Sequence, residues 1–351
     1  MPVGTQGTVK GLTPRDLRDA NVQIVLANTY HLWVRPGHGL VESLGGLHRF
    51  MDWSGPILTD SGGYQVFSLA ELRKVSEEGV RFRSPHDGQW RTLTPELAVQ
   101  IQEALGVDVA MAFDECAEWP ATEERVAQAM ARTTRWLRRC TAARRRPEHT
   151  ALFGIVQGGT FEHLRREHAA ELGAMDLDGY ALGGLSVGEP REEMFRIAGA
   201  IAPLLPADKV RYLMGVGYPI DLVDGVTAGV DLFDCVLPTR SARFGAVFTS
   251  VGRVVIKHAR YRDDPGPLDP DCACYTCARF SRAYLRHLFV ADEMLAPRLL
   301  TLHNVTFYQG LMARLRTAVE SGDPAALAAV REQAARSMGP PDGTPALSPP
   351  P

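Results

Sequence analysis

Short runs of apolar, often β-branched residues recur along the chain, and each run ends in a small or polar residue. They span residues 3–5, 24–28, 57–60, 107–114, 152–157, 180–184, 212–215 and 230–234. Continuous apolar runs of this length are typical of parallel strands that are buried on both faces. The pattern therefore predicts about eight buried strands.

Helix-like stretches separate these runs. Thr94 followed by Pro95 combines an N-cap residue with a proline at the first helical position, which predicts a helix start. Thr122 before Glu124 gives a similar signal. Strands that alternate with helices predict an α/β fold, a (β/α)8 TIM barrel. An open doubly wound sheet is the alternative that periodicity alone does not exclude.

In a barrel, the carboxyl ends of the strands converge on one face, where the active site forms. The residues at these ends are Asn28, Asp60, Asp114, Gln157, Gly184, Gly215 and Asp234. Any one of the aspartates could simply cap the next helix. Three carboxylates beside glycines that let a ligand approach the backbone favour a binding site.

Composition narrows the class of protein. The 351 residues are 45% hydrophobic, which suffices for a large core. No apolar run is long enough to span a bilayer, and the first residues do not resemble a signal peptide. Six cysteines, three of them clustered, favour a reducing compartment, so we expect a cytoplasmic protein.

The clustered cysteines form a set of metal ligands. Cys272, Cys274 and Cys277 occupy one short run after a turn-rich segment, and His303 follows a helix's length later. Three thiolates and one imidazole complete a tetrahedral zinc site and leave no position for water or substrate. The set predicts one structural zinc ion, and the alternative is three unrelated thiols in an exposed loop.

Positive charge is concentrated around this cluster. The net charge of the chain is −3, yet residues 235–316 contain 12 Lys and Arg against 6 Asp and Glu. A basic segment around a zinc knuckle fits a phosphate-binding surface. A solvated basic face explains the charge alone equally well.

The segments around the strand ends suggest chemistry. Glycines after Asp60 permit a tight turn that presents Tyr64 as a stacking surface for a flat ligand, with a core tyrosine as the alternative. Asp114, followed by Glu115 and Cys116, offers acceptors for the donor edge of a purine-like base.

Further along the chain, Gln157 and the segment 183–189 add an amide and exposed backbone groups. Asp234 is closely followed by arginines, which suits attack on a sugar carbon beside a phosphate backbone. Two carboxylates that face a glycosidic bond can act as nucleophile and acid/base. Because no histidine accompanies Cys116 or Cys235 in its motif, a cysteine nucleophile is not expected.

Read together and in this order, the motifs over residues 1 to about 330 resemble the bacterial tRNA-guanine transglycosylases. That family has a (β/α)8 barrel with a C-terminal zinc subdomain. It exchanges the wobble guanine, position 34, of GUN-anticodon tRNAs (those for aspartate, asparagine, histidine and tyrosine) for 7-aminomethyl-7-deazaguanine (preQ1) in queuosine biosynthesis. The resemblance implies a homodimeric transferase that binds tRNA, preQ1, guanine and one structural zinc ion.

The resemblance also implies roles for single residues. Asp234 would attack C1′ of the ribose and hold a covalent tRNA intermediate, and Asp60 would be the general acid/base that deprotonates the incoming base. Arg240 and Arg243 would hold anticodon nucleotides. The implied base-binding residues are Asp114, Gln157, Gly184, Leu185, Tyr64, Met214, Cys116 and Glu189. The family's zinc ligands match Cys272, Cys274, Cys277 and His303.

Within this set, Asp114, Gln157 and the Gly184 amide would read the base edges, and Tyr64 and Met214 would sandwich the ring. Leu185, with Glu189 behind it, would present a backbone group that suits either guanine or the aminomethyl substituent. Cys116 and Val187 resemble the bacterial pocket that accepts the small aminomethyl base.

The resemblance extends to assembly and domain organisation. An aromatic cluster at the family's dimer interface corresponds to Phe50, Phe280, Tyr284 and His287, with core packing as the alternative. The expected organisation is a barrel over residues 1–338, including a zinc subdomain at about 240–310 inserted after the last strand. A proline-rich tail at 339–351 is expected to be disordered. The family also has a longer N-terminal segment, whose strands cover one end of the barrel.

Two other functions stay open on the sequence. A non-catalytic RNA-binding subunit could share the fold, but the presence of both Asp60 and Asp234 argues against it. The second alternative is a barrel glycosidase that acts on a small sugar, and the zinc knuckle and the basic segment argue against it.

Overall fold

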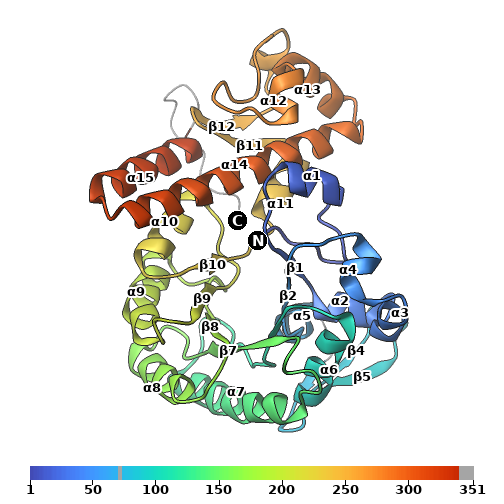
Figure 1. Ribbon diagram of the computed structural model, residues 1–351, viewed down its shortest axis with the longest axis vertical. Helices are drawn as coiled ribbons and strands as arrows, with labels where there is room; N and C mark the ends of the chain where they lie inside the picture. The colour runs from blue at the N-terminus through green and yellow to red at the C-terminus, as the bar shows by residue number, and fades with distance from the viewer. Residues whose placement is uncertain (70–72, 340–351) are drawn as a thin grey trace.

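The structure is a computed structural model that describes residues 1–69 and 73–339 (Figure 1). Seven parallel strands form one curled sheet in the order β1-β2-β6-β7-β8-β9-β10, so neighbours in the sheet follow one another along the chain. These strands are β1 (Val25–Ala27), β2 (Ile57–Thr59), β6 (Val109–Met111), β7 (Ala151–Val156), β8 (Gly179–Leu182), β9 (Val210–Leu213) and β10 (Leu232–Phe233).

The first residues of the chain close this sheet into a barrel. Val3 forms a parallel bridge with Leu26 of β1, and Pro2 forms one with Cys235, two residues after the end of β10. The N–H of Gly4 also donates to the Leu26 carbonyl at 2.6 Å. The sequence predicts a full strand at residues 3–5, whereas the structure has isolated bridges, because Pro2 has no N–H with which to extend a ladder. The α/β barrel prediction is confirmed, and the open doubly wound sheet is wrong.

Helices cover the outer face of the barrel (Figure 1). They are α1 (Pro14–Asp19), α2 (Thr29–Val34), α3 (His38–Ser43), α4 (Gly46–Met51), α5 (Gly63–Leu69), α6 (Pro95–Leu105), α7 (Glu123–Ala143), α8 (Glu162–Gly173), α9 (Arg191–Ile201), η1 (Ala202–Leu204), α10 (Pro219–Thr227) and α15 (Pro324–Met338). Both predicted helix starts are confirmed. The Thr94 hydroxyl accepts from the Leu97 N–H at 3.2 Å, and Thr122 caps α7 in the same way.

A small antiparallel sheet lies between α5 and α6. It consists of β3 (Arg73–Val75), β4 (Val80–Arg83) and β5 (Trp90–Leu93). Val80 and Phe82 of β4 are buried, whereas Arg81 and Arg83 face solvent. The pattern of apolar runs did not predict this sheet.

Side chains on the barrel strands alternate between two hydrophobic clusters. Leu26, Leu58 and Tyr212 belong to a cluster whose members all come from the strands and the closing segment, as expected for a barrel interior. Val25 and Ile57, one position away, pack with helix residues instead. Alternate side chains along each strand therefore face the barrel interior and the surrounding helices. The site is formed by the residues at the carboxyl ends of the strands.

The segment after β10 forms a smaller unit with its own hydrophobic cluster, which includes Val247, Leu268 and Leu285. Its elements are α11 (Leu237–Arg243), β11 (Ala246–Thr249), β12 (Gly252–Val255), η2 (Ala259–Tyr261), α12 (Tyr275–Arg279), α13 (Arg282–Val290) and α14 (Leu295–Ser321). The long α14 runs between this unit and the barrel and packs against α10 and α15 as well as α11, α12 and α13 (Figure 1).

Of the predicted tail at 339–351, only Gly339 is among the described residues. Among the described residues, no helix has the length and apolar character needed to cross a membrane.

Candidate active site

The predicted strand-end residues meet at one rim of the barrel. Asn28 Nδ2 donates to a carboxylate oxygen of Asp60. Gln157 Nε2 donates to Asp114 at 2.7 Å, and the Gly215 N–H donates to Asp234 at 2.8 Å. Hydrogen bonds therefore link residues from adjacent strand ends, as the barrel prediction requires.

Asp60 is a buried carboxylate with both oxygens occupied. Its Oδ1 accepts from the N–H groups of Thr29 at 2.9 Å and Gly62 at 3.2 Å, and its Oδ2 accepts from Gln65 at 2.7 Å as well as from Asn28. Burial, with a smaller contribution from the nearby Asp234 carboxylate, raises the pKa of Asp60 to about 6 in spite of these donors. Asp60 can therefore gain and lose a proton near neutral pH.

Asp114 is the second buried carboxylate. Ser61 donates to its Oδ1 at 3.1 Å and Gln157 to its Oδ2 at 2.7 Å. Burial raises the pKa of Asp114 to about 6 as well. The adjacent Glu115 points elsewhere and forms ion pairs with Arg125 and Arg132 of α7. Only Asp114 of this acidic pair therefore faces the site.

Asp234 is held differently from the other two carboxylates. Its Oδ1 accepts from the Tyr212 hydroxyl at 2.5 Å and from the Gly215 N–H at 2.8 Å. Its Oδ2 accepts no hydrogen bond from the part of the chain that the structure describes. The Asp234 and Asp60 carboxylates together raise the pKa of Tyr212, after burial, so both lie close to its hydroxyl.

The loop after β8 has a defined backbone orientation. Both carboxylate oxygens of Glu189 are occupied, by the N–H groups of Ser186 at 2.5 Å and Val187 at 3.0 Å. Because the N–H and C=O of a trans peptide point in opposite directions, the Leu185 carbonyl points away from Glu189. Gly184 has a φ of +61°, and a Cβ there would meet Gln157 Oε1 at 2.3 Å. A glycine is therefore required at this position.

Two other predicted base contacts differ in exposure. Tyr64 is 55% exposed, so the core alternative for this side chain is wrong. Met214 is partly buried against the barrel interior. Burial raises the pKa of the Cys116 and Cys235 thiols to about 12, which leaves neither as a ready nucleophile.

Three polar residues behind the rim were not singled out from the sequence. Tyr212 holds Asp234, Arg165 donates to carbonyls of the β7 and β8 loops, and His168 Nδ1 accepts the Gln157 N–H at 2.9 Å. The helical spacing of apolar residues could have predicted that Arg165 and His168 are buried, because both lie on the same buried face of α8 as Leu164 and Leu172.

The three cysteines and the histidine come together in the smaller unit. Their ligand atoms lie within 4.8 Å of one another, so this cluster could hold a metal ion. His303 Nδ1 lies 3.3 Å from Cys277 Sγ and 3.7 Å from Cys274 Sγ. Its Nε2 lies 2.8 Å from the Phe248 carbonyl, to which it donates, and Nδ1 is then the free ligand atom. The reading as unrelated exposed thiols is wrong.

The predicted RNA-binding and interface residues lie outside the rim. Arg240 and Arg243 are exposed on α11, and Arg240 lines a cavity of about 200 Å³ together with Gly215, Asp221 and Cys235. On α13 the Tyr284 ring is 40% exposed and stacks on Phe280, with the ring centroids 5.4 Å apart. Phe50 and His287 are also exposed, whereas Phe280 is partly buried against the core of the smaller unit, so core packing accounts for Phe280 alone. The four predicted interface residues are Phe50, Phe280, Tyr284 and His287.

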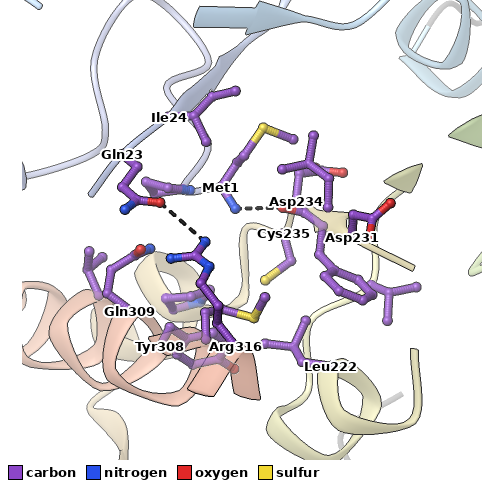
Figure 2. A pocket seen from close by; sticks show the side chains of 17 residues that line it. Met1, Gln23, Ile24, Leu222, Asp231, Asp234, Cys235, Tyr308, Gln309 and Arg316 are labelled. Carbon is purple, nitrogen blue, oxygen red and sulfur yellow. Dashed lines mark hydrogen bonds between the residues drawn. The ribbon is translucent and has the colours of Figure 1, made fainter. Parts of the chain in front are cut away.

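A second cavity, of about 100 Å³, lies at the seam between the first residues, β10 and α14 (Figure 2). Arg316 reaches across it to Gln23 Oε1 at 3.4 Å, and the Met1 ammonium donates to the Phe233 carbonyl at 2.5 Å. Most of its lining is apolar, and neither Asp60 nor Asp114 contributes. Asp234, however, is among its lining residues, so this cavity adjoins the rim that carries the polar site.

Comparisons with known proteins identify the family of this chain. A family model described as "Queuine tRNA-ribosyltransferase" matches residues 1–338. Three curated relatives carry the same name and are 57% identical to this chain. One, from Geobacillus kaustophilus (strain HTA426), aligns over 319 residues, which is 91% of this chain and 84% of the relative. The others align over 322 residues (92% and 87%; Pelotomaculum thermopropionicum) and 333 residues (95% and 89%; Solidesulfovibrio magneticus). With the family model matching nearly the whole chain, this protein belongs to the queuine tRNA-ribosyltransferase family, the tRNA-guanine transglycosylases, and is a pentosyltransferase that modifies tRNA.

Proposed function

We propose that this protein exchanges guanine 34 of GUN-anticodon tRNAs for preQ1, through a covalent bond between Asp234 and the ribose, in queuosine biosynthesis. The observation that carries the proposal is a pair of differently held carboxylates at one rim. Asp60 is buried with both oxygens hydrogen-bonded, whereas Asp234 has one oxygen held and one free of donors from the described residues. A proton carrier beside an oriented nucleophile is what glycosidic exchange needs.

The reaction then has two halves. Asp234 Oδ2 attacks C1′, the C1′–N9 bond breaks, and guanine leaves with the bonding electrons and takes a proton from Asp60. The Asp60 carboxylate next removes the N9 proton of preQ1, whose N9 attacks C1′ and releases Asp234. A pKa near 6 suits Asp60 to both transfers. Tyr212 and Gly215 orient Asp234 by binding Oδ1.

The base would be read by complementary donors and acceptors. The Asp114 carboxylate accepts from the N1–H and the 2-amino group, and the Gly184 amide donates to the oxygen at C6. Gln157, which already bonds to Asp114, adds a further amide. Tyr64 and Met214 stack on the two faces of the base, and the 55% exposure of the Tyr64 side chain supports its role.

The loop after β8 supports preQ1 as the incoming base. Glu189 holds the Ser186 N–H, so the Leu185 carbonyl of the same peptide is available as an acceptor on the opposite side. A carbonyl suits the aminomethyl group, which is a cationic donor at neutral pH. Val187 and Cys116 complete the small pocket that the family resemblance implies.

We further propose that the metal is zinc and that its role is structural. Tetrahedral ligands with Zn–S of about 2.3 Å and Zn–N of about 2.0 Å lie roughly 3.5–3.8 Å apart. The two sulfur–nitrogen distances, 3.3 and 3.7 Å, lie on either side of the roughly 3.5 Å expected for a sulfur and a nitrogen on one zinc ion. Cys272, Cys274, Cys277 and His303 fill all four positions, so zinc would fix the smaller unit, at about residues 240–310, beside the barrel.

Two further proposals concern partners. Arg240 and Arg243 bind anticodon phosphates next to Asp234, and their exposure on α11 supports this role. A homodimer interface forms at Phe50, Phe280, Tyr284 and His287, three of which are exposed, and the oligomeric state in solution will test this. Because the substrate is tRNA, we place the reaction in the cytoplasm.

The decisive experiment is incorporation of labelled guanine into a GUN-anticodon tRNA. Asp234→Ala should abolish incorporation and the tRNA–protein adduct that survives denaturation, because no oxygen is left to bond C1′. Asp263→Ala, at an exposed carboxylate of the smaller unit, is the control and should retain both. Full exchange by Asp234→Ala would sink the covalent mechanism, and exchange of guanine without uptake of preQ1 would contradict the substrate assignment.

A further inference from the structure

Arg165 lies behind the base-binding rim and is fully buried. It projects from the first turn of α8 toward the loops that follow β7 and β8. Its guanidinium donates to four backbone carbonyls, those of Gly159 at 2.5 Å, Val156 at 3.2 Å, Gly183 at 2.8 Å and Gly184 at 3.1 Å. These carbonyls bracket Gln157 in one loop and include Gly184 in the other.

Burying this cation is costly. Arg165 forms no ion pair with any residue that the structure describes, and burial lowers the pKa of Arg165 to about 10. Removing an ion from water carries a desolvation cost that remains even after the protein relaxes. An apolar side chain would fill the same space at lower cost, so packing alone does not explain an arginine here.

The position of the charge relative to the peptide groups suggests its effect. The Gly183 carbonyl and the Gly184 N–H belong to one peptide unit, as do the Gly184 carbonyl and the Leu185 N–H. A cation bound at a carbonyl oxygen polarises the whole peptide and makes the N–H at its other end a stronger donor. Arg165 binds both carbonyls through Nη2.

A second residue of α8 supports this interpretation. His168, three positions after Arg165, accepts the Gln157 N–H at 2.9 Å and lies 3.0 Å from the Thr134 hydroxyl. Burial lowers the pKa of His168 to about 4, which keeps it a neutral acceptor. One helix face thus fixes the backbone of both loops, and Arg165 supplies the only charge of this pair.

We propose that Arg165 is a positioning residue for base exchange, which fixes the β7 and β8 loops and strengthens the Gly184 amide as a donor to the oxygen at C6 of the base. This inference rests on the proposed function, because it takes that amide as a base contact. When the C1′–N9 bond breaks, guanine departs with the electron pair, and part of the negative charge resides on this oxygen. A strengthened donor stabilises the departing base more than the bound tRNA.

The test compares three bases as inhibitors of labelled-guanine exchange. Guanine carries the C6 oxygen and the 2-amino group. 2-Aminopurine lacks the C6 oxygen and with it the N1–H, and hypoxanthine lacks only the 2-amino group that Asp114 would bind. Arg165→Met should reduce the preference for guanine over 2-aminopurine on the order of tenfold, the worth of about one hydrogen bond. The preference for guanine over hypoxanthine should stay unchanged, and kcat should fall more than KM for tRNA rises.

Arg139→Lys is the matched control. Arg139 also donates to backbone carbonyls, those of Glu77 and Glu78, but at the partly exposed outer side of α7. This variant should retain all three preferences. General loosening of the fold would instead lower both preferences of Arg165→Met together, and that result would overturn the inference.

The outcomes separate this inference from the function on which it rests. If the wild-type protein does not prefer guanine over 2-aminopurine, the proposed base contact itself is wrong. If the wild-type protein has this preference and Arg165→Met keeps it, the role of Arg165 is wrong. Should Arg165→Met fail to fold by circular dichroism, Arg165→Lys decides. A lysine keeps the positive charge but lacks the planar guanidinium. The preference of Arg165→Lys for guanine over 2-aminopurine should therefore lie between those of the wild-type protein and Arg165→Met, and an unchanged preference rejects the proposal.

Discussion

At the scale of single residues, the site depends on carboxylates that differ in their surroundings. Asp60 and Asp114 are buried, and both have a pKa raised to about 6. Asp234 is half-buried and bonds through one oxygen. The strand-end pattern was enough to predict all three positions. Their different environments were not predictable, because these depend on donors such as Asn28 and Tyr212 from other strands.

These raised pKa values set the pH dependence of exchange. Asp60 must be ionised to take a proton from the incoming base, and Asp114 must be ionised to accept from its donor edge. Both conditions fail as pH falls through about 6. We expect kcat/KM for the incoming base to fall below this pH by up to about a hundredfold per pH unit, since two groups titrate.

Measuring kcat/KM for the incoming base from pH 4.5 to 8 tests this fall at acidic pH. Asp114→Asn leaves a single titrating carboxyl, so its slope should drop to about tenfold per unit. An acid limb near pH 4 in the wild-type protein would show that burial does not control these groups.

At the scale of elements, apolar runs and helix caps predicted most of the barrel. The clearest failure is the sheet β3–β5, although its strand β4 alternates buried and exposed residues. That strand has only four residues, and arginines fill its exposed positions, which made it resemble a charged loop. Arg165 and His168 were missed for a related reason, because periodicity places a residue on the buried face without saying what it binds.

The loop after β8 gives an element-scale prediction. Gly184→Ala puts a side chain at a φ of +61° and within 2.3 Å of Gln157 Oε1. Gln157 must then move and lose its bond to Asp114. We expect a loss of about 2 kcal/mol in the free energy of unfolding and at least tenfold weaker inhibition by guanine.

Thermal unfolding and guanine inhibition measure the two effects. Gly199→Ala is the control, because this glycine is exposed in α9 and a Cβ there has open space. It should raise stability by about 0.5–1 kcal/mol and leave inhibition unchanged. Equal behaviour of the two variants would show that the loop does not need its glycine.

At the scale of the whole molecule, the metal cluster and the barrel are joined by α14, which carries His303. Removing the metal with a chelator should therefore disturb the basic unit more than the base pocket. We expect a midpoint of thermal unfolding lower by roughly 10 °C and a KM for tRNA raised at least about tenfold.

Inhibition by free guanine should change little in the metal-free protein, and added zinc should restore tRNA binding. His303→Ala should behave like the chelated protein. His163→Ala removes an exposed histidine paired with Glu123 and should have no effect. A metal-free protein that stays folded and fully active would contradict this role.

The uneven charge of the molecule leads to a prediction about salt. Arg240 and Arg243 are exposed on α11, and Arg240 lines a cavity together with the rim residue Gly215. If they bind phosphates, replacing both by alanine should weaken tRNA binding and make the plot of log affinity against log salt shallower by about 1.4–1.8. Arg331→Ala is the control, because Arg331 lies on α15 and forms an ion pair with Asp224 of α10. This variant should leave the slope unchanged. An unchanged slope in the double variant would place the RNA elsewhere.

The closure of the barrel by its first residues also sets the order in which the nascent chain folds. The bridges at Pro2 and Val3 join the first residues to β1 and to Cys235, and the Met1 bond to Phe233 spans 232 positions. During synthesis, the early strands and helices can pair as they leave the ribosome, but this seam must wait for β10. Asp60 and Asp234 come into register only at that step. A nascent chain therefore acquires its structure gradually and its catalytic centre late.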